Sequence, residues 1–361
     1  MLKLEDFLIE MVDRKASDLF LKAGNTPCIR VDGAILSMDF PELTAQDTRR
    51  LAERMMTEKQ IQAFEEAPEM DLALGVPGIG RFRVNILRQR GSISMVLRHI
   101  SNPNLSFEEL NLPRTVQDLA EKPRGMTLVT GTTGSGKSTT LAAMINHINN
   151  IRKCHIVTIE DPIEFLHSDN QALISQREVG FDTQNFADAL KHVLRQSPDV
   201  ILIGEMRDLE TIQTAIAAAE TGHLVLSTLH TTDTVQTVER IINYFPAYLH
   251  NQIRMELSLT LQGIISQRLL PRAVGRGRVP AVELLVATPM IRKLLNEGRT
   301  LELANYIQDG EEEGMQTFNQ SLVKLYNKGL IRYEVALAYA TSPDEFRLAA
   351  EGIATGASAA R

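Results

Sequence analysis

Residues 127–139 read TLVTGTTGSGKST, and this stretch decides the fold of the larger part of the chain. Gly131 to Ser138 fit the pattern G-x-x-x-x-G-K-[ST], which joins a strand to a helix in proteins that bind nucleotide phosphates. Here the apolar residues 128–130 predict the strand, and the run 141–148 predicts the helix. The alternative, a glycine-rich turn that binds nothing, leaves this context unexplained.

The chemistry of the loop follows from its residue types. Its glycines let backbone N–H groups converge on phosphate oxygens, and the helix adds partial positive charge at its amino end. Lys137 is expected to reach the β and γ phosphates, and Ser138 to ligate Mg²⁺. The predicted nucleotide-binding residues are Gly131, Thr132, Thr133, Gly134, Ser135, Gly136, Lys137, Ser138 and Thr139.

Short apolar segments alternate with helical stretches on both sides of this loop. The segments span 127–130, 156–159, 200–203 and 224–228, as in a parallel α/β sheet that is buried on both faces. Beyond Ser258 the pattern favours helices, interrupted by one strand at 281–287. We divide the chain into an N-terminal domain (1–101), a linker (102–115), a nucleotide-binding core (116–270) and a mostly helical C-terminal part (271–361).

Acidic side chains at strand ends decide whether such a loop serves hydrolysis. Glu205 follows an apolar strand, on the ligand side of a parallel sheet, where it can orient the Mg²⁺ shell through a water molecule. Glu160, Asp161 and Glu164 follow another strand, and we choose Glu164 as the base that activates water. The alternatives are an exposed strand-end acid for Glu205 and a turn-capping acid for Glu164.

Two histidines bracket the strand 224–228. At about 3.3 Å per residue His223 and His230 lie roughly 23 Å apart, so one straight strand cannot bring both to the same phosphate. We therefore assign His230, on the ligand edge, as a sensor of the γ-phosphate; the alternative is a histidine that satisfies a backbone carbonyl. For His223 a structural role and an interface role remain equally open.

The N-terminal domain is expected to be a helix-flanked antiparallel sheet that carries a run of arginines. No acidic residue lies between Asp71 and Glu108, whereas five arginines fall between residues 81 and 98. Alternation in Arg81-Phe82-Arg83-Val84 places the two arginines on one face of a strand. This face is either simply solvated or supplies arginine fingers to the transferring phosphate, in the same subunit or in a neighbouring one.

Overall composition limits the remaining function classes. The 361 residues include 38 basic and 45 acidic side chains, which gives a net charge of -7 and no global footprint for nucleic acid. We expect no signal peptide, because three of the first ten residues are acidic, and no apolar run is long enough to span a membrane. The two cysteines, Cys28 and Cys154, lie far apart. We expect a cytoplasmic protein without a cysteine zinc site.

Four stretches together resemble a known family. GTTGSGKSTT (131–140), TIEDPIEF (158–165), SPDVILIGEMRDLET (197–211) and AAAETGHLVLSTLHTTDT (217–234) are similar to the motifs of the type II/IV secretion ATPase superfamily, and within it of the type IV pilus retraction ATPases. SDLFL (17–21), RFRVN (81–85) and GMQTFNQ (314–320) extend the resemblance over nearly the whole chain.

The resemblance implies a PAS-like α+β N-terminal domain, a RecA-like P-loop ATPase domain with a helical C-terminal part, and a hexamer that holds ATP between the domains. It implies that Glu160, Asp161 and Glu164 form the acidic box, Glu205 the Walker B acid, and His223 and His230 the histidine box. The family's N-terminal arginines correspond to Arg81, Arg83 and Arg98. The implied partners are a second copy, an inner-membrane pilus platform protein and a paralogous retraction ATPase, with the protein peripheral at that membrane.

Two departures bear on the subtype. The chain begins at the PAS-like domain and lacks the tetracysteine site of extension ATPases, which favours retraction. Retraction enzymes typically carry a helix similar to AIRNLIRE, where this chain has MIRKLLNE (290–297), so an accessory role stays open. A pilus extension or secretion ATPase, a RecA-like nucleic-acid translocase and a small-molecule kinase also stay open. The acidic balance argues against the translocase, and the arginine-bearing domain argues against the kinase.

Overall fold

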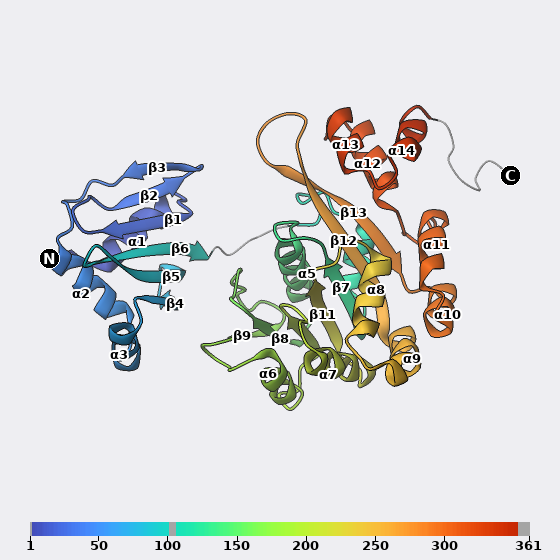
Figure 1. Cartoon of the computed structure of the whole chain (residues 1–361), viewed down its shortest axis with the longest axis horizontal. Coiled ribbons are helices and arrows are strands. Elements are labelled where there is room, and N and C mark those ends of the chain that lie inside the picture. The colour runs from blue at the N-terminus through green and yellow to red at the C-terminus, as the bar shows by residue number, and fades with distance from the viewer. Residues whose placement is uncertain (1, 101–105, 353–361) are drawn as a thin grey trace. The chain divides into compact units, whose positions relative to one another are not determined.

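The computed structural model describes residues 2–100 and 106–352 of the chain (Figure 1). They form two compact units, one of Met1–Asn102 with Glu164–Leu166 and one of Pro103–Ile163 with His167–Arg361. Residues 102–105 of the expected linker and the end of the C-terminal part lie outside the described residues. Residues 106–115 belong to the second unit, where Phe107 and Leu112 are buried in its core.

The first unit is a six-stranded antiparallel sheet with three helices. The strand order is β3-β2-β1-β6-β5-β4. The elements are α1 (Leu4–Asp13), β1 (Asp18–Lys22), β2 (Cys28–Val31), β3 (Ala34–Ser37), α2 (Ala45–Met55), α3 (Glu58–Glu66), β4 (Glu69–Val76), β5 (Gly80–Gln89) and β6 (Ser92–Ile100).

Alternation in this sheet separates a core face from a polar face. Phe82, Val84 and Ile86 of β5 are buried with the apolar residues of α1 and α2. Arg81 and Arg83 alternate with them and therefore lie on the opposite face, as the sequence predicts. The helix-flanked antiparallel sheet expected for this part of the chain is confirmed.

The second unit is a seven-stranded sheet of order β13-β12-β7-β11-β10-β8-β9. Six strands run parallel, and β13 at the edge is antiparallel to β12. The strands are β7 (Gly125–Thr130), β8 (His155–Glu160), β9 (Leu173–Glu178), β10 (Val200–Ile203), β11 (Leu224–Leu229), β12 (Leu261–Pro271) and β13 (Arg278–Val286). The predicted parallel α/β sheet is confirmed.

Helices cover both faces of this sheet, so its central strands are buried throughout. One core includes α4 (Arg114–Ala120) and α5 (Lys137–Ile151). The other includes α6 (Phe186–Val193), α7 (Leu209–Glu220), α8 (Thr234–Asn243), α9 (His250–Thr260), α10 (Pro289–Glu297) and α11 (Leu303–Asp309). Two short 3₁₀ turns, η1 (Ala247–Leu249) and η2 (Thr300–Glu302), precede α9 and α11.

The expectation of helices directly after Ser258 is wrong for residues 261–271, which form β12. An apolar run such as Leu261, Ile264 and Ile265 fits either a buried strand or a buried helix, because periodicity alone does not separate them. Pairing with β7 on one side and β13 on the other decides for the strand. The sheet therefore continues across residue 270, where we placed the end of the core.

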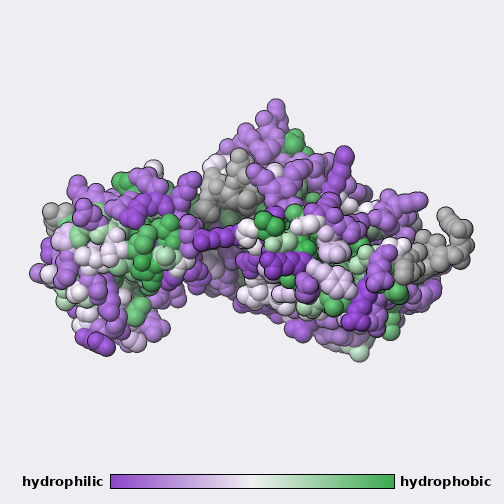
Figure 2. All heavy atoms as spheres, turned by 90° about the horizontal axis from the view of Figure 1, so that it is seen from above, coloured by the Kyte–Doolittle hydropathy of each residue, from purple (hydrophilic) through white to green (hydrophobic). Residues whose placement is uncertain are grey.

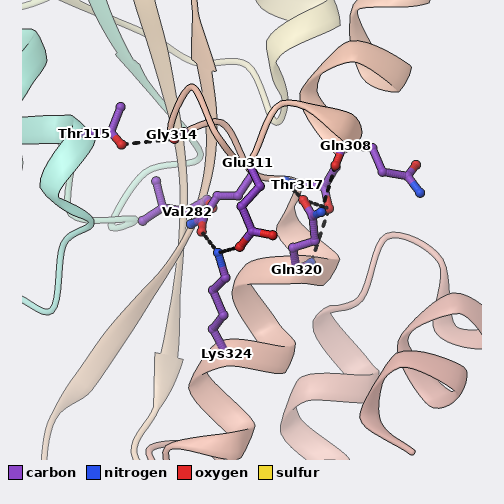
Figure 3. A network of polar contacts seen from close by, with 9 residues as sticks. Thr115, Val282, Gln308, Glu311, Gly314, Thr317, Gln320 and Lys324 are labelled. Carbon is purple, nitrogen blue, oxygen red and sulfur yellow. Dashed lines mark hydrogen bonds and ion pairs between the residues drawn. The ribbon is translucent and has the colours of Figure 1, made fainter. Parts of the chain in front are cut away.

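The C-terminal helices α12 (Phe318–Asn327), α13 (Tyr333–Tyr339) and α14 (Pro343–Ala350) pack on this hairpin. The GMQTFNQ stretch anchors them, as Figure 3 shows. Thr115 Oγ1 donates to the carbonyl of Gly314 over 3.0 Å, and Lys324 pairs with Glu311 at 2.7 Å. None of the described helices is long and apolar enough to span a membrane. Hydrophilic residues cover much of the face that Figure 2 shows.

Candidate nucleotide-binding site

The phosphate loop spans residues 131–136, between the end of β7 and the start of α5. Gly131 has a φ of 144°, and a Cβ there would lie 2.4 Å from Ser135 Oγ and 2.6 Å from the carbonyl oxygen of Gln267. Only glycine fits this position. Gly136, the residue before α5, also has a positive φ, 94°, which glycine adopts without strain. The loop is therefore built on the glycines that the motif predicts.

Lys137 is buried at the first turn of α5. Its ammonium group donates to the carbonyl oxygens of Gly131 and Thr132, at 2.9 and 3.1 Å. The positive charge is thus enclosed by the loop that precedes it in the chain. A buried cation in this position suits a polyphosphate, which would replace carbonyl dipoles by full negative charges.

The remaining loop residues fit a magnesium nucleotide. Ser135 is 3% exposed, and its Oγ makes no hydrogen bond to any described residue. A buried hydroxyl without a partner is costly, so a phosphate oxygen would be a favourable acceptor there. Ser138 and Thr139 lie partly exposed on the first helical turn. Their position suits Ser138 as an oxygen ligand of Mg²⁺.

Glu205 and His230 are brought together by two neighbouring parallel strands. β10 ends at Ile203 and β11 at Leu229, so the residues that come after both strands share the carboxyl edge of the sheet. His230 Nε2 lies 3.1 Å from Glu205 Oε2. Arg207, which sequence reasoning did not single out, forms an ion pair with the other oxygen of this carboxylate. Glu205 is mostly buried, and its Oε1 has no hydrogen-bond donor among the described residues, so only the charge of Arg207 offsets the burial of that oxygen.

The backbone holds these strand ends in register. Thr228 Oγ1 donates to the carbonyl of Gly204 at 2.7 Å, and the N–H of Met206 donates to the carbonyl of Thr228 at 3.2 Å.

Burial lowers the pKa of His230, and the charges of Lys137 and Arg207 lower it further. The imidazole is therefore neutral at pH 7, and it lies near enough to Lys137 to sense its charge.

The acidic box comes after the neighbouring strand, β8. Glu160 ends this strand, and its Oε1 accepts hydrogen bonds from Thr158 Oγ1 at 2.6 Å and from Gln176 at 3.1 Å. Gly204 packs against the backbone of Glu160, so the ends of β8 and β10 adjoin. Asp161 and Glu164 are exposed in the loop after β8. Glu164 belongs to the segment that groups with the first unit, and its role as base stays a prediction.

His223 lies at the other edge of the sheet. It precedes β11, and its carbonyl accepts the N–H of Gly125, the first residue of β7. Its Nδ1 lies 2.9 Å from the carbonyl of Ala218. Within this chain His223 therefore does not join His230 and Glu205, which agrees with the strand-length argument.

A cavity of about 370 Å³ opens beside the phosphate loop. Besides residues 131–135 its lining includes Thr232, Gln267, Arg268, Leu269, Arg278 and Tyr339. Sequence reasoning missed this wall, because it depends on the β12–β13 hairpin that the pattern did not reveal. The arginines in QRLLPRAVGRGR (267–278) were the available signal.

The arginines of the first unit lie on neighbouring strands, with Arg83 opposite Arg98 in the register of β5 and β6. Asp18 of β1 is buried next to Arg98, which donates to it at 2.9 Å, and Arg30 pairs with its other oxygen at 3.3 Å. Arg83 is exposed and Arg81 half-buried. This face is thus a partly neutralised cationic surface rather than a bare one.

A glycine-rich loop between a buried strand and a helix, with a carboxylate and a histidine at neighbouring strand ends, defines a P-loop nucleotide-binding protein. Residues 2–302 match the family model described as type II/IV secretion system protein. The chain belongs to this family, as the four motifs predict, and it is an ATPase.

Two relatives are from Pseudomonas aeruginosa. The chain is 47% identical to its type IV pilus retraction ATPase PilT over 92% of this chain and 96% of that protein. It is 45% identical to the type IV pilus ATPase PilU, over 96% of this chain and 91% of the relative. Among solved structures, the pilus retraction motor PilT with bound ADP is 48% identical, with a TM-score of 0.87 over 96% of this chain and 99% of that one.

Proposed function

We propose that this chain is a hexameric ATP-hydrolysing motor that powers type IV pilus retraction, by pilin disassembly, for twitching motility. The observation that carries the proposal is the similarity to PilT, which extends over nearly the full length of both chains in sequence and in structure. The proposal includes a PAS-like N-terminal domain and a RecA-like core, with ATP and Mg²⁺ as cofactors.

Each site residue has a role in this proposal. The loop 131–139 binds the phosphates, with Lys137 at the β and γ groups and Ser138 as a ligand of the metal ion. Magnesium supplies charge neutralisation to the phosphates when it is bound. Glu205 orients the water shell of the ion, and Glu164 accepts the proton of the attacking water.

His230 and the arginines complete the proposed site. Neutral His230 donates a hydrogen bond from its Nε2–H group to Glu205. In this position His230 senses the terminal phosphate. Arg81, Arg83 and Arg98 neutralise charge on the transferring group. We propose His223 as an interface residue of the hexamer. The pilus platform protein would be the partner at the inner membrane, with this protein on the cytoplasmic side.

A second candidate is an accessory role, like that of PilU, because the two identities are nearly equal. Helix α10 bears on this choice. Ile291 is fully buried, and Arg292 donates to the carbonyl of Ser258 at 2.6 Å, at the end of α9. MIRKLLNE differs from AIRNLIRE at four positions, of which Met290, Lys293 and Asn296 are exposed and Leu295 is buried. Three of the four differences therefore lie on the surface of α10.

Deletion of the gene followed by complementation tests the proposal. A principal retraction motor leaves excess surface pili and no twitching, and both are restored by the wild-type chain but not by Lys137→Ala. Bald cells would indicate an extension ATPase, and unchanged cells an accessory copy. ATP turnover with and without DNA is the matched biochemical test, because strong stimulation by DNA would favour the translocase.

A further inference from the structure

Glu283 is a largely buried carboxylate that lies outside the predicted site. It sits on β13 opposite Ser266 of β12. Its Oε1 accepts the backbone N–H of Thr234 at 2.8 Å, and Thr234 is the first residue of α8. This N–H is one of the amide groups that a helix leaves unsatisfied at its start. The carboxylate of Glu283 therefore caps α8 from another strand.

The capped helix begins directly after the loop that carries His230. Residues 230–233 connect the end of β11 to Thr234, and hydrogen bonds tie the loop to the first turns of α8. Thr231 Oγ1 lies 2.7 Å from Thr237 Oγ1, which in turn donates to the carbonyl of Asp233 at 2.7 Å. A shift of the helix start would thus move the loop with it.

Charges of both signs surround the cap. Asp233 accepts the N–H of Gln236 at 2.8 Å, so two carboxylates complement the positive end of α8. The pKa of Glu283 is raised by its burial and by the charge of Asp233, although the hydrogen bonds from Thr234 and the charge of Arg268 act in the opposite direction. Arg268, which lines the cavity beside the phosphate loop, is held by the carbonyl of Tyr339 at 2.7 Å.

We propose that Glu283 is a positioning residue for ATP hydrolysis: through the N–H of Thr234 it fixes the start of α8 and thereby holds His230 at Glu205. Neither Glu283 nor Thr234 lines the cavity beside the phosphate loop. Loss of the cap should therefore affect turnover more than binding. This inference rests on ATP hydrolysis and is independent of the role in pilus retraction.

Four variants separate the cap from general stability. Glu283→Leu removes the acceptor, and Glu283→Gln keeps an oxygen acceptor without the charge. Thr234→Pro removes the donor at a helical position that tolerates proline. Thr234→Val keeps the backbone donor and removes only the Thr234 hydroxyl, which also faces the Glu283 carboxylate, so this variant tests the N–H by itself. Thermal unfolding of each variant shows which ones are folded.

The readouts are kcat for ATP and the Kd of a non-hydrolysable ATP analogue, measured on the full chain. We expect Glu283→Leu and Thr234→Pro to lower kcat by about tenfold to a hundredfold, with Kd changed less than about twofold. Glu283→Gln and Thr234→Val should stay close to wild type. Wild-type turnover, measured alongside, keeps a failure of the ATPase assignment apart from a failure of this inference.

Three results would overturn the proposal. They are a kcat of Glu283→Leu close to wild type, a Kd that worsens in step with kcat, and a Glu283→Gln variant as impaired as Glu283→Leu. If Glu283→Leu does not fold, Thr234→Pro decides, because it removes the same hydrogen bond and leaves the buried side chain of β13 in place.

Discussion

The carboxyl edge of the seven-stranded sheet and the arginine face of the six-stranded sheet both carry predicted site residues, but they differ in how those residues are held. At the carboxyl edge Lys137, Glu205 and His230 each have partners from the same unit. On the arginine face Arg83 is exposed, whereas Arg98 has a buried carboxylate, Asp18, beside it. The carboxyl edge is therefore preorganised by its own contacts, whereas the arginine face keeps an exposed positive charge at Arg83.

The largest expected effect is at the phosphate loop. Lys137→Ala should weaken binding of ATP by about 100-fold or more, because a buried ammonium group that binds phosphate oxygens is lost. Fluorescence titration with an ATP analogue measures it. Lys153→Ala, an exposed lysine just before β8, is the control. An unchanged Kd in Lys137→Ala would mean that the loop does not bind the nucleotide.

Glu205 tests whether the carboxyl edge does more than bind. Glu205→Gln should keep the analogue Kd within about twofold but lower kcat by about 100- to 1,000-fold, since the charge that orients the metal shell is absent. Glu210→Gln, at an exposed carboxylate of α7 that pairs with Lys191, serves as the control. Equal losses in both variants would make the effect a general one of surface charge.

The arginine face gives a smaller effect in the same assay. Arg83→Ala should lower kcat by about tenfold if this face supplies charge to the transferring phosphate. Arg49→Ala, at an exposed position of α2, controls for the loss of a cation from the same unit. Equal kcat values for the two variants would mean that the arginine face is only a solvated surface.

How far the sequence could predict each region depends on how its contacts arise. Glu205 and His230 come directly after consecutive parallel strands, and parallel strands have their carboxyl ends at one edge of the sheet, so chain order alone brings the two residues together. Asp18 meets Arg98 across 80 positions of chain through the pairing of β1 with β6. No local pattern specifies that register.

The wall of the cavity was missed for a related reason. Arg268 and Arg278 reach the phosphate loop only because β12 pairs with β7 and β13 then turns back along β12. Because an apolar run fits a helix and a strand equally well, the sequence pattern does not reveal such a hairpin. The contact of Glu283 with Thr234 depends on the same long-range packing, whereas Arg207 pairs locally with Glu205, two residues before it. Each would read as an ordinary charged residue in the sequence.

The two histidines that flank β11 offer the finest comparison, because they lie at opposite edges of the sheet. His230→Gln should lower kcat by about tenfold, since the neutral ring that contacts Glu205 is replaced by a shorter amide. His223→Gln should change neither kcat nor the analogue Kd of the isolated subunit by more than about twofold, because its contacts are with Ala218 and Thr221 at the opposite edge. Equal losses in the two variants would contradict the assignment.

The pH profile sharpens the same prediction. The pKa of His230 lies below its ordinary value of 6.5, so the ring of the folded protein gains its proton only at lower pH. Turnover of the wild type should fall as pH drops through that lowered pKa, and His230→Gln should lose this acid limb. The unfolded chain takes up the proton first, so the folded state also loses stability below about pH 6.5. An acid limb of the same shape in both proteins would assign it to a carboxylate, with Glu205 as the nearest one.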